Sequence, residues 1–187
     1  AKMNLAIRGI AHNLGDKPVS TFLDDRHKDK KVNFIMANPP FNLKKWRGED
    51  ELTDDYRWRG YGIPPAANAN YAWILHMLSK LDVSNGIAGF LLANGALNSN
   101  SVEGSIRKQL IENDKVEEII VLPRNMFYTT EISVTLWIIN NNKKARVLNG
   151  RQLRNREKEV LFVDLRHWDT NVEEYVIDTV KKTKKRK

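Results

Sequence analysis

Four consecutive residues, Asn38-Pro39-Pro40-Phe41, combine groups that could hold and activate an exocyclic amino group. The Asn38 side-chain carbonyl accepts a hydrogen bond, and a proline carbonyl on the stiff backbone beside it can supply a second acceptor. Two acceptors aimed at one NH2 group would orient that amine and make its nitrogen a better nucleophile. Phe41 offers a flat face on which a planar ring can stack. The tetrapeptide therefore predicts a pocket for the amino group of a base lifted out of its helix.

The same residues allow a purely structural interpretation, in which Asn-Pro-Pro ends a strand and Phe41 is a core residue. The sequence on either side favours the site. A short apolar run, residues 32–37, precedes Asn38, and a long irregular region, residues 42–66, follows Phe41. Open α/β sheets bind ligands at the carboxyl ends of their strands, and a long loop in a compact domain is usually functional or disordered.

The hydrophobic pattern alternates between helix and strand periods, which places the motif on an α/β scaffold. Helices are expected where apolar residues share a stripe, at Met3–Leu14, at Tyr71–Leu81 and after a cap at Ser101. Uninterrupted apolar strands indicate an open, mostly parallel sheet covered on both faces. Strands 116–122 and 132–139 are joined by too short a link for a helical crossover and should pair antiparallel. The expected strands are residues 32–37, 86–93, 116–122, 132–139 and 160–164.

Composition excludes several functional classes. The 187 residues contain no cysteine, which excludes disulfide scaffolds and cysteine-based metal or thiol chemistry and fits a cytoplasmic location. No apolar run long enough to span a membrane occurs, so we expect no membrane partner. The net charge is +8, but removing the six basic residues of the last seven, 181–187, leaves +2. That tail, with a milder basic stretch over residues 143–156, could attract phosphates or could be a solvated terminus.

The loop after the motif mixes cationic and aromatic side chains. Such a mixture suits contact with a nucleic-acid backbone and an unstacked base, but aromatic residues can equally pack a loop onto its own domain or onto a partner. Both interpretations remain open at this point. The residues concerned are Lys44, Lys45, Trp46, Arg47, Tyr56, Arg57, Trp58, Arg59 and Tyr61.

Asn38 to Phe41 resemble the signature of adenine-N6 DNA methyltransferases, and the surrounding blocks narrow the resemblance. In order along the chain, these blocks are similar to the modification subunits of type I restriction–modification systems. The similarity covers nearly the whole chain up to about residue 165. The blocks are MNLAIRGI (3–10), STFLDDRH (20–27), FIMANPPFNLKKW (34–46), RWRGYGIPPAANANYAWILHML (57–78), EGSIRKQLIENDKVEEIIVLP (103–123) and MFYTTEISVTLWIINN (126–141).

This resemblance implies a Rossmann-like fold that transfers a methyl group from S-adenosyl-L-methionine to N6 of a flipped-out adenine in double-stranded DNA. Asn38 and the Pro39 carbonyl, stiffened by Pro40, would hold the amine, and Phe41 would stack on the base. From the cationic and aromatic mixture of the loop, and not from the resemblance, the candidates for contact with DNA are Lys44, Lys45, Trp46, Arg57 and Arg59. It also implies assembly of two modification subunits with a specificity subunit, which a restriction subunit can join.

The chain departs from the family in one large respect. The family's Gly-rich turn, which holds the methionine end of the cofactor, is missing, and Gly60-Tyr61-Gly62 lies in a loop with no strand before it. We therefore expect a fragment, inactive alone, with residues 1–165 as the C-terminal part of the catalytic domain and 166–187 as a basic extension. Acidic residues are frequent in the family where Ser20 and Asn33 stand here, whereas Asp25 matches and is the candidate contact to the cofactor's adenosine.

Other residues and other functions remain as alternatives. Asn68 and Asn70 could line the pocket or cap the helix that follows them. The four histidines show no ligand spacing, so we predict no metal site. Asn-Pro-Pro motifs also occur in methyltransferases that act on RNA bases or on glutamine amides, usually with Tyr in place of Phe41. A non-catalytic module that binds nucleic acid or a partner through residues 143–187 is the third possibility.

Overall fold

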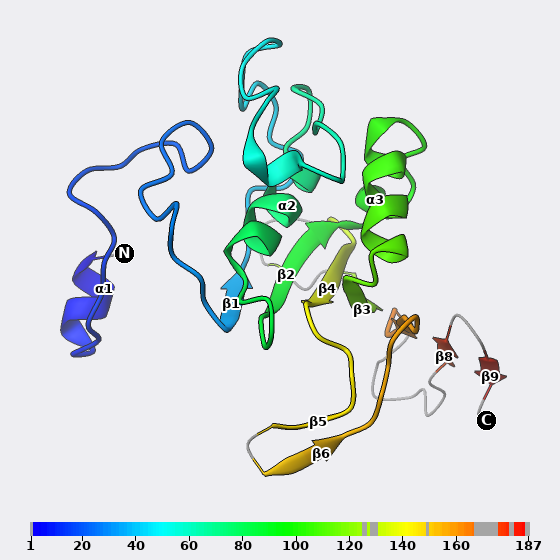
Figure 1. The fold of residues 1–187 in the computed structure, drawn as a ribbon. Coiled ribbons are helices and arrows are strands. Elements are labelled where there is room, and N and C mark those ends of the chain that lie inside the picture. Colours follow the sequence, from blue (N-terminus) through cyan, green and yellow to red (C-terminus); the bar gives the residue numbers. More distant parts are fainter. Residues whose placement is uncertain are drawn as a thin grey trace.

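A computed structural model describes residues 2–124, 127, 131–148, 150–166, 176–179 and 182–185. These form a seven-stranded sheet on which helices pack, and a separate two-stranded sheet (Figure 1). The expected alternation of strands and helices is confirmed, with small shifts at the boundaries. The helices are α1 Lys2–Ile7, η1 Tyr56–Trp58, α2 Asn70–Lys80, η2 Asn94–Leu97 and α3 Val102–Glu112. The strands are β1 Phe34–Ala37, β2 Ile87–Ala93, β3 Val116–Val121, β4 Val134–Asn140, β5 Arg146–Leu148, β6 Arg151–Leu153, β7 Leu161–Asp164, β8 Val176–Thr179 and β9 Lys182–Lys185.

The main sheet has the strand order β1-β2-β4-β3-β7-β8-β9. Strands β1 and β2 pair in parallel, as do β3 and β7, whereas β4 lies between β2 and β3 and is antiparallel to both. The antiparallel pairing of β3 with β4 was expected from their short connection. Strand β1 is an edge strand in the described part of the chain, so the motif that follows it leaves the sheet at an open side.

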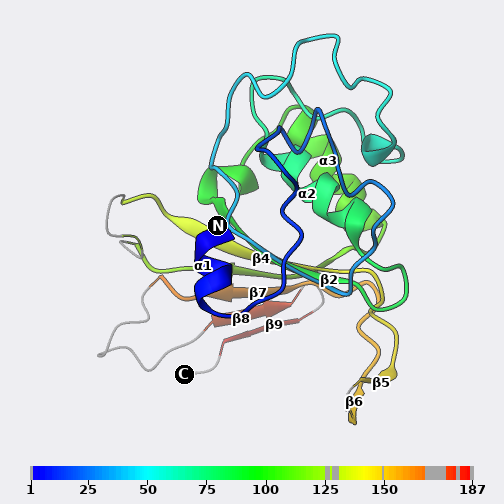
Figure 2. The ribbon, with the colours of Figure 1, turned by 90° about the vertical axis from the view of Figure 1, so that its left-hand side faces the viewer.

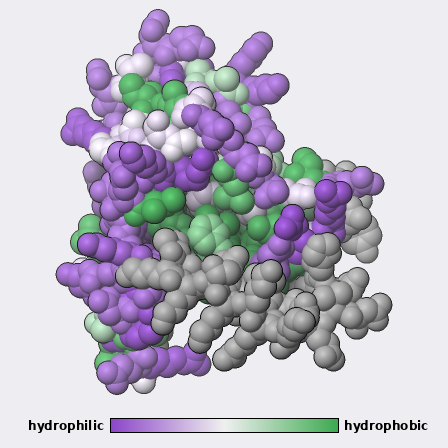
Figure 3. Space-filling model, turned by 90° about the vertical axis from the view of Figure 1, so that its right-hand side faces the viewer, coloured by the Kyte–Doolittle hydropathy of each residue, from purple (hydrophilic) through white to green (hydrophobic). Residues whose placement is uncertain are grey.

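Helices α2 and α3 both pack on the same face of the sheet (Figure 2). The prediction that both faces are covered is therefore wrong for the described residues. On the helix side Phe90 and Trp137 are fully buried, whereas on the other side Phe34 and Met36 are 65% and 93% exposed. The apolar pattern of a strand indicates which residues suit burial, but it does not indicate which other element packs against them. On the side of the molecule that carries α3, hydrophobic residues gather across the middle (Figure 3).

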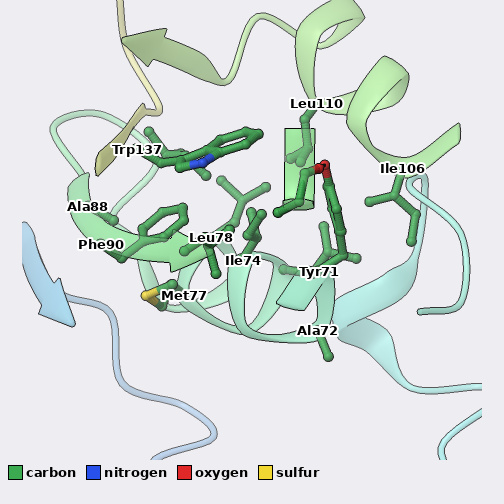
Figure 4. Packing of buried hydrophobic residues seen from close by; sticks show 14 of the residues in the cluster. Tyr71, Ala72, Ile74, Met77, Leu78, Ala88, Phe90, Ile106, Leu110 and Trp137 are labelled. Atoms are coloured by element: carbon green, nitrogen blue, oxygen red, sulfur yellow. Dashed lines mark hydrogen bonds between the residues drawn. The ribbon is translucent and has the colours of Figure 1, made fainter. Parts of the chain in front are cut away.

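The core lies between α2, α3 and the sheet. Tyr71 and Ile74 of α2, Ile106 and Leu110 of α3, and Trp137 of β4 converge there (Figure 4) and are each 0% exposed. Their spacing of three or four residues puts them on one side of each helix, which is the pattern that the sequence contains. This core makes α2 a rigid support for whatever its N-terminus holds.

The opening helix is shorter than its apolar stripe. α1 ends at Ile7 because Gly9 adopts a left-handed backbone (φ 63°) and the Ile10 amide donates back to the Leu5 carbonyl, which closes the helix. Ile10 and Leu14 therefore lie beyond it. Near the other end, β5 and β6 form a separate two-stranded ribbon, and β8 and β9 extend the main sheet. In the described residues no helix is both long and apolar enough to cross a membrane.

Candidate active site

The motif lies at the carboxyl end of β1, directly after Ala37. Asn38 is exposed, Pro39 is buried, and no described residue donates to or accepts from the Asn38 side chain. An asparagine at a strand end usually bonds to the turn that follows it. Its side-chain carbonyl is therefore available to a ligand.

Two adjoining cavities open beside the motif, between β1, α2 and the segment 13–27. The smaller, about 260 Å³, is lined by Asn38 and Pro39, and the larger, about 500 Å³, by Asp25 and its neighbours. The larger volume is in the range of roughly 300–1,000 Å³ that small-molecule sites occupy. Four residues line both cavities, which makes them one continuous hollow: Thr21, Ile35, His76 and Lys80.

Phe41 is half-buried, and its ring lies edge-on to that of Phe127 at a centroid distance of 6.2 Å. An edge-to-face contact leaves one face of the Phe41 ring free for stacking. Phe41 is not part of the buried core cluster, which disfavours its interpretation as a core residue, and its stacking role stays a prediction.

Two members of the DNA-contact set belong to the interior. Trp46 is 6% exposed, packs against Phe22 at 4.6 Å between ring centroids, and donates its indole N–H to the Pro65 carbonyl. Arg57 is 4% exposed and pairs with Asp55 at 2.7 Å. Trp46 and Arg57 are therefore corrected from DNA contacts to packing residues of the 42–66 loop, because their polar groups are used inside the protein. Lys44, Lys45 and Arg59 are exposed.

Arg57 connects the 42–66 loop to the rest of the protein. Besides Asp55, its guanidinium donates to the backbone carbonyls of Thr21 and Phe22 at 3.3 and 2.7 Å, and lies 3.2 Å from His76 Nδ1. One cation thus ties the loop to the segment that lines the cavities and to α2. The sequence pattern did not indicate this role, because an arginine in a polar, charged loop has the pattern of a surface residue.

Asp25 is held by an ion pair with Lys80 at 2.5 Å and accepts a hydrogen bond from Tyr56 Oη. Burial alone would raise the pKa of Asp25, but the hydrogen bonds from Lys80 and from the His27 backbone, with the charge of Lys80, lower it below its usual 3.8. The carboxylate is therefore ionised at neutral pH in the wall of the larger cavity. Its predicted contact with the cofactor stays a prediction.

His76 is not among the candidate site residues that the sequence pattern predicts. It lines both cavities, and burial followed by the nearby charge of Arg57 lowers its pKa from 6.5 to about 4. The imidazole is therefore neutral at pH 7. Because Nδ1 faces the Arg57 donor, it acts as the acceptor, and Nε2 carries the proton.

The asparagines at the start of α2 have separate roles. Asn68 accepts from the Asn70 backbone N–H at 2.9 Å, whereas the Asn70 side chain bonds to Asn42 in the motif loop. Asn68 therefore satisfies the backbone N–H of the first residue of α2, although the N-cap position itself is Ala69, which makes no side-chain capping bond.

Three of the six basic residues in the stretch over residues 143–156 are paired with acidic side chains. Arg154 is one of them, 2.7 Å from Glu159. Lys143 is 3% exposed and pairs with Asp114 at 2.5 Å, and Arg156 pairs with Glu117 at 2.9 Å. Among the described residues, no group of three or more His, Asp or Glu side chains is arranged so that it could hold a metal ion.

Comparison with known proteins gives the family of this fold and site. Residues 1–183 match the N-6 DNA Methylase family. The chain is 46% identical over 167 residues to the type I restriction enzyme HindI methylase subunit of Haemophilus influenzae, covering 89% of this chain and 34% of that protein. It is 42% identical to the MjaIX methylase subunit of Methanocaldococcus jannaschii, covering 79% and 27%.

Solved structures agree with this assignment. The methyltransferase subunit of a type I restriction-modification system from Streptococcus thermophilus superposes with a TM-score of 0.74 at 25% identity, over 92% of this chain and 34% of that one. The fold of this protein is thus that of the class I S-adenosylmethionine-dependent methyltransferases. The chain belongs to the N-6 DNA Methylase family and is similar to type I methylase subunits, of whose length it spans about a third.

Proposed function

We propose that this chain is the motif-bearing part of a type I modification subunit that methylates N6 of a flipped-out adenine in double-stranded DNA. The observation that carries the proposal is the Asn38 side chain, exposed and without a described partner, at the mouth of a cavity at a strand's carboxyl end. Family membership gives that geometry its chemical meaning.

In this proposal the Asn38 side-chain carbonyl and the Pro39 backbone carbonyl accept hydrogen bonds from the adenine amino group. Pro39 and Pro40 keep the backbone between them stiff, because proline fixes φ. The N6 lone pair then points away from the two acceptors and toward the cavity. The free face of Phe41 stacks on the base and holds its plane. The work of the site is orientation and polarisation of the amine.

The cavity beside the motif fits the adenosine part of S-adenosyl-L-methionine in size and in polarity. Its walls combine the apolar Ile35 with the neutral His76 and the ionised Asp25, so that it offers both stacking surface and polar contacts. When bound, this cofactor supplies an electrophilic methyl group. Asp25 shapes the wall, since its charge is already balanced by Lys80. The Gly-rich turn for the methionine end is not among the residues of this chain.

Contact with DNA falls to the exposed cations of the 42–66 loop, Lys44, Lys45 and Arg59. Lys44 and Lys45 follow the motif closely, so that phosphates bound there would flank the flipped base. As the resemblance implies, a specificity subunit would read the sequence and a restriction subunit could join two modification subunits.

The test is methyl transfer from labelled S-adenosyl-L-methionine to unmethylated duplex DNA by the full-length subunit with its specificity partner. Asn38→Ala should abolish N6-methyladenine formation while DNA binding is retained. Unchanged methylation in that variant would overturn the site. If the wild-type complex methylated RNA or glutamine amides and not DNA, the proposed DNA substrate would be wrong.

A further inference from the structure

The loop that carries the motif is joined to α2 by a reciprocal pair of amides. Asn42 donates its backbone N–H to Asn70 Oδ1 at 3.0 Å, and Asn70 Nδ2 donates to Asn42 Oδ1 at 2.9 Å. Asn68 Nδ2 adds a longer bond of 3.4 Å to the same Asn42 oxygen. Both ends of the Asn70 amide are therefore used on one residue of the loop.

Asn70 is a rigid partner. It is 1% exposed, and its own backbone N–H is held by Asn68 at 2.9 Å. The Ala69 N–H donates to the Leu43 carbonyl at 3.0 Å, which adds a second link between α2 and the loop. The next residue of the helix, Tyr71, is fully buried in the core. A buried amide with both functions satisfied fixes its partner within a narrow range of positions.

Asn42 lies next to the motif, so fixing its position also restrains the four residues of the motif. It directly follows Phe41, and its backbone is left-handed (φ 53°), a conformation that asparagine tolerates better than most residues. Between Asn38 and Asn42, the prolines 39 and 40 have fixed φ angles. A chain that is stiff in the middle and held at one end keeps the other end in place as well.

We propose that the Asn42–Asn70 amide pair is the positioning device of this site, which holds Phe41 and Asn38 in register for a planar base. The inference rests on the proposed function, and it assigns a role to two residues that do not themselves touch the reacting amine. Loss of the pair lets the motif loop move by a fraction of an ångström to an ångström, and misplacement of that size costs on the order of 100-fold in rate. The cofactor cavity has neither residue in its wall, so cofactor affinity stays as it is.

The experiment uses the full-length subunit with its specificity partner, with kcat measured at saturating duplex DNA and S-adenosyl-L-methionine. Asn70→Ala removes both hydrogen bonds of the pair. Asn42→Ala removes only the bond that Asn70 Nδ2 donates, because the Asn42 backbone N–H remains. Asn42→Asp keeps an acceptor for Asn70 Nδ2 and is the conservative variant. The dissociation constant of the cofactor and the deuterium uptake of the segment 38–43 are measured alongside.

Asn140 supplies a matched control. It is also 1% exposed and also uses both ends of its amide, donating to Glu117 at 2.7 Å and accepting from the Asn142 N–H at 2.9 Å. It pairs with Ile87 at the amino end of β2, whereas the motif follows the carboxyl end of the parallel strand β1. Asn140→Ala should therefore lower Tm about as much as Asn70→Ala does, without touching the site.

Asn70→Ala and Asn42→Ala are expected to lower kcat about 10- to 100-fold, with a cofactor dissociation constant within about twofold of wild type and faster exchange at 38–43. Asn42→Asp should recover most of the lost kcat, and Asn140→Ala should keep wild-type kcat and exchange. Equal kcat in Asn70→Ala and Asn140→Ala, with Asn38→Ala inactive, would overturn the positioning role and leave the proposed function standing. A wild-type complex that transfers no methyl group to DNA would overturn both.

Discussion

Arg57 Nη1 lies 3.2 Å from His76 Nδ1. His76 lines the cavities, and the buried guanidinium of Arg57 contacts its neutral imidazole. Burial is the largest cause of the lowered pKa of His76, and the nearby charge of Arg57 lowers it further. The contact with Arg57 thus opposes protonation of His76. It also joins parts of the chain that are far apart in sequence.

His76 should make stability depend on pH in a defined window. Its pKa is about 4 in the folded protein, against an ordinary value of 6.5 in the unfolded chain. The unfolded chain therefore binds more protons between these values, and the free energy of unfolding falls by up to about 3 kcal/mol as pH drops from 6.5 to 4.

Denaturant unfolding of wild type and His76→Gln at several pH values checks this. The glutamine accepts the Arg57 hydrogen bond but does not titrate, so most of the slope above pH 4 should vanish. The lowered pKa of Asp25 acts with the same sign, but below its ordinary value of 3.8. An unchanged slope between pH 6.5 and 4 would contradict the assignment to His76.

Arg57→Met should destabilise the protein by about 3–5 kcal/mol, because it leaves Asp55 as a buried and uncompensated charge. Arg59→Met, two residues away and exposed, should change the free energy of unfolding by less than about 0.5 kcal/mol. Equal effects of the two substitutions in urea denaturation would show that Arg57 is not the attachment point of the loop.

Asp25 and Lys80 should show energetic coupling in a double-mutant cycle of Asp25→Asn and Lys80→Met. The side chains are 12% and 10% exposed, and a coupling of about 1–3 kcal/mol is expected for such a shielded pair. The pair of Arg26 with Asp24, which are 28% and 56% exposed, is the control and should give less than about 1 kcal/mol. Coupling no larger than in the control pair would contradict a structural role for Asp25.

The exposed lysines of the motif loop should set part of the salt dependence of DNA binding. Each phosphate contact contributes about 0.9 to the slope of log K against log salt concentration. Lys44→Ala with Lys45→Ala should therefore reduce the slope by about 2, whereas Lys108→Ala, 70% exposed on α3, should leave it unchanged. Binding isotherms of the complex at several salt concentrations measure this, and equal slopes would remove both lysines from the interface.

Residue types and spacing were enough to predict the strand before the motif and the antiparallel pairing of β3 with β4, because these depend on local pattern and on a short connection. The family was indicated by the resemblance of several blocks spread along the chain, and the comparisons confirm it. They could not show which loop residues are buried. Trp46 and Arg57 have the types and spacing of a nucleic-acid contact, and only packing against Phe22, Asp55 and α2 reveals that they lie inside.

The sequence by itself determined the chemistry that this chain can offer, since an amide carbonyl, a proline carbonyl and a phenyl ring in four residues are a local property. Tertiary structure alone decided which groups surround that chemistry. Asn70 meets Asn42 across 28 positions, and Arg57 meets His76 across 19, because α2 packs on the sheet beneath the loop. Contacts over such separations arise from the arrangement of the elements, which no local pattern encodes.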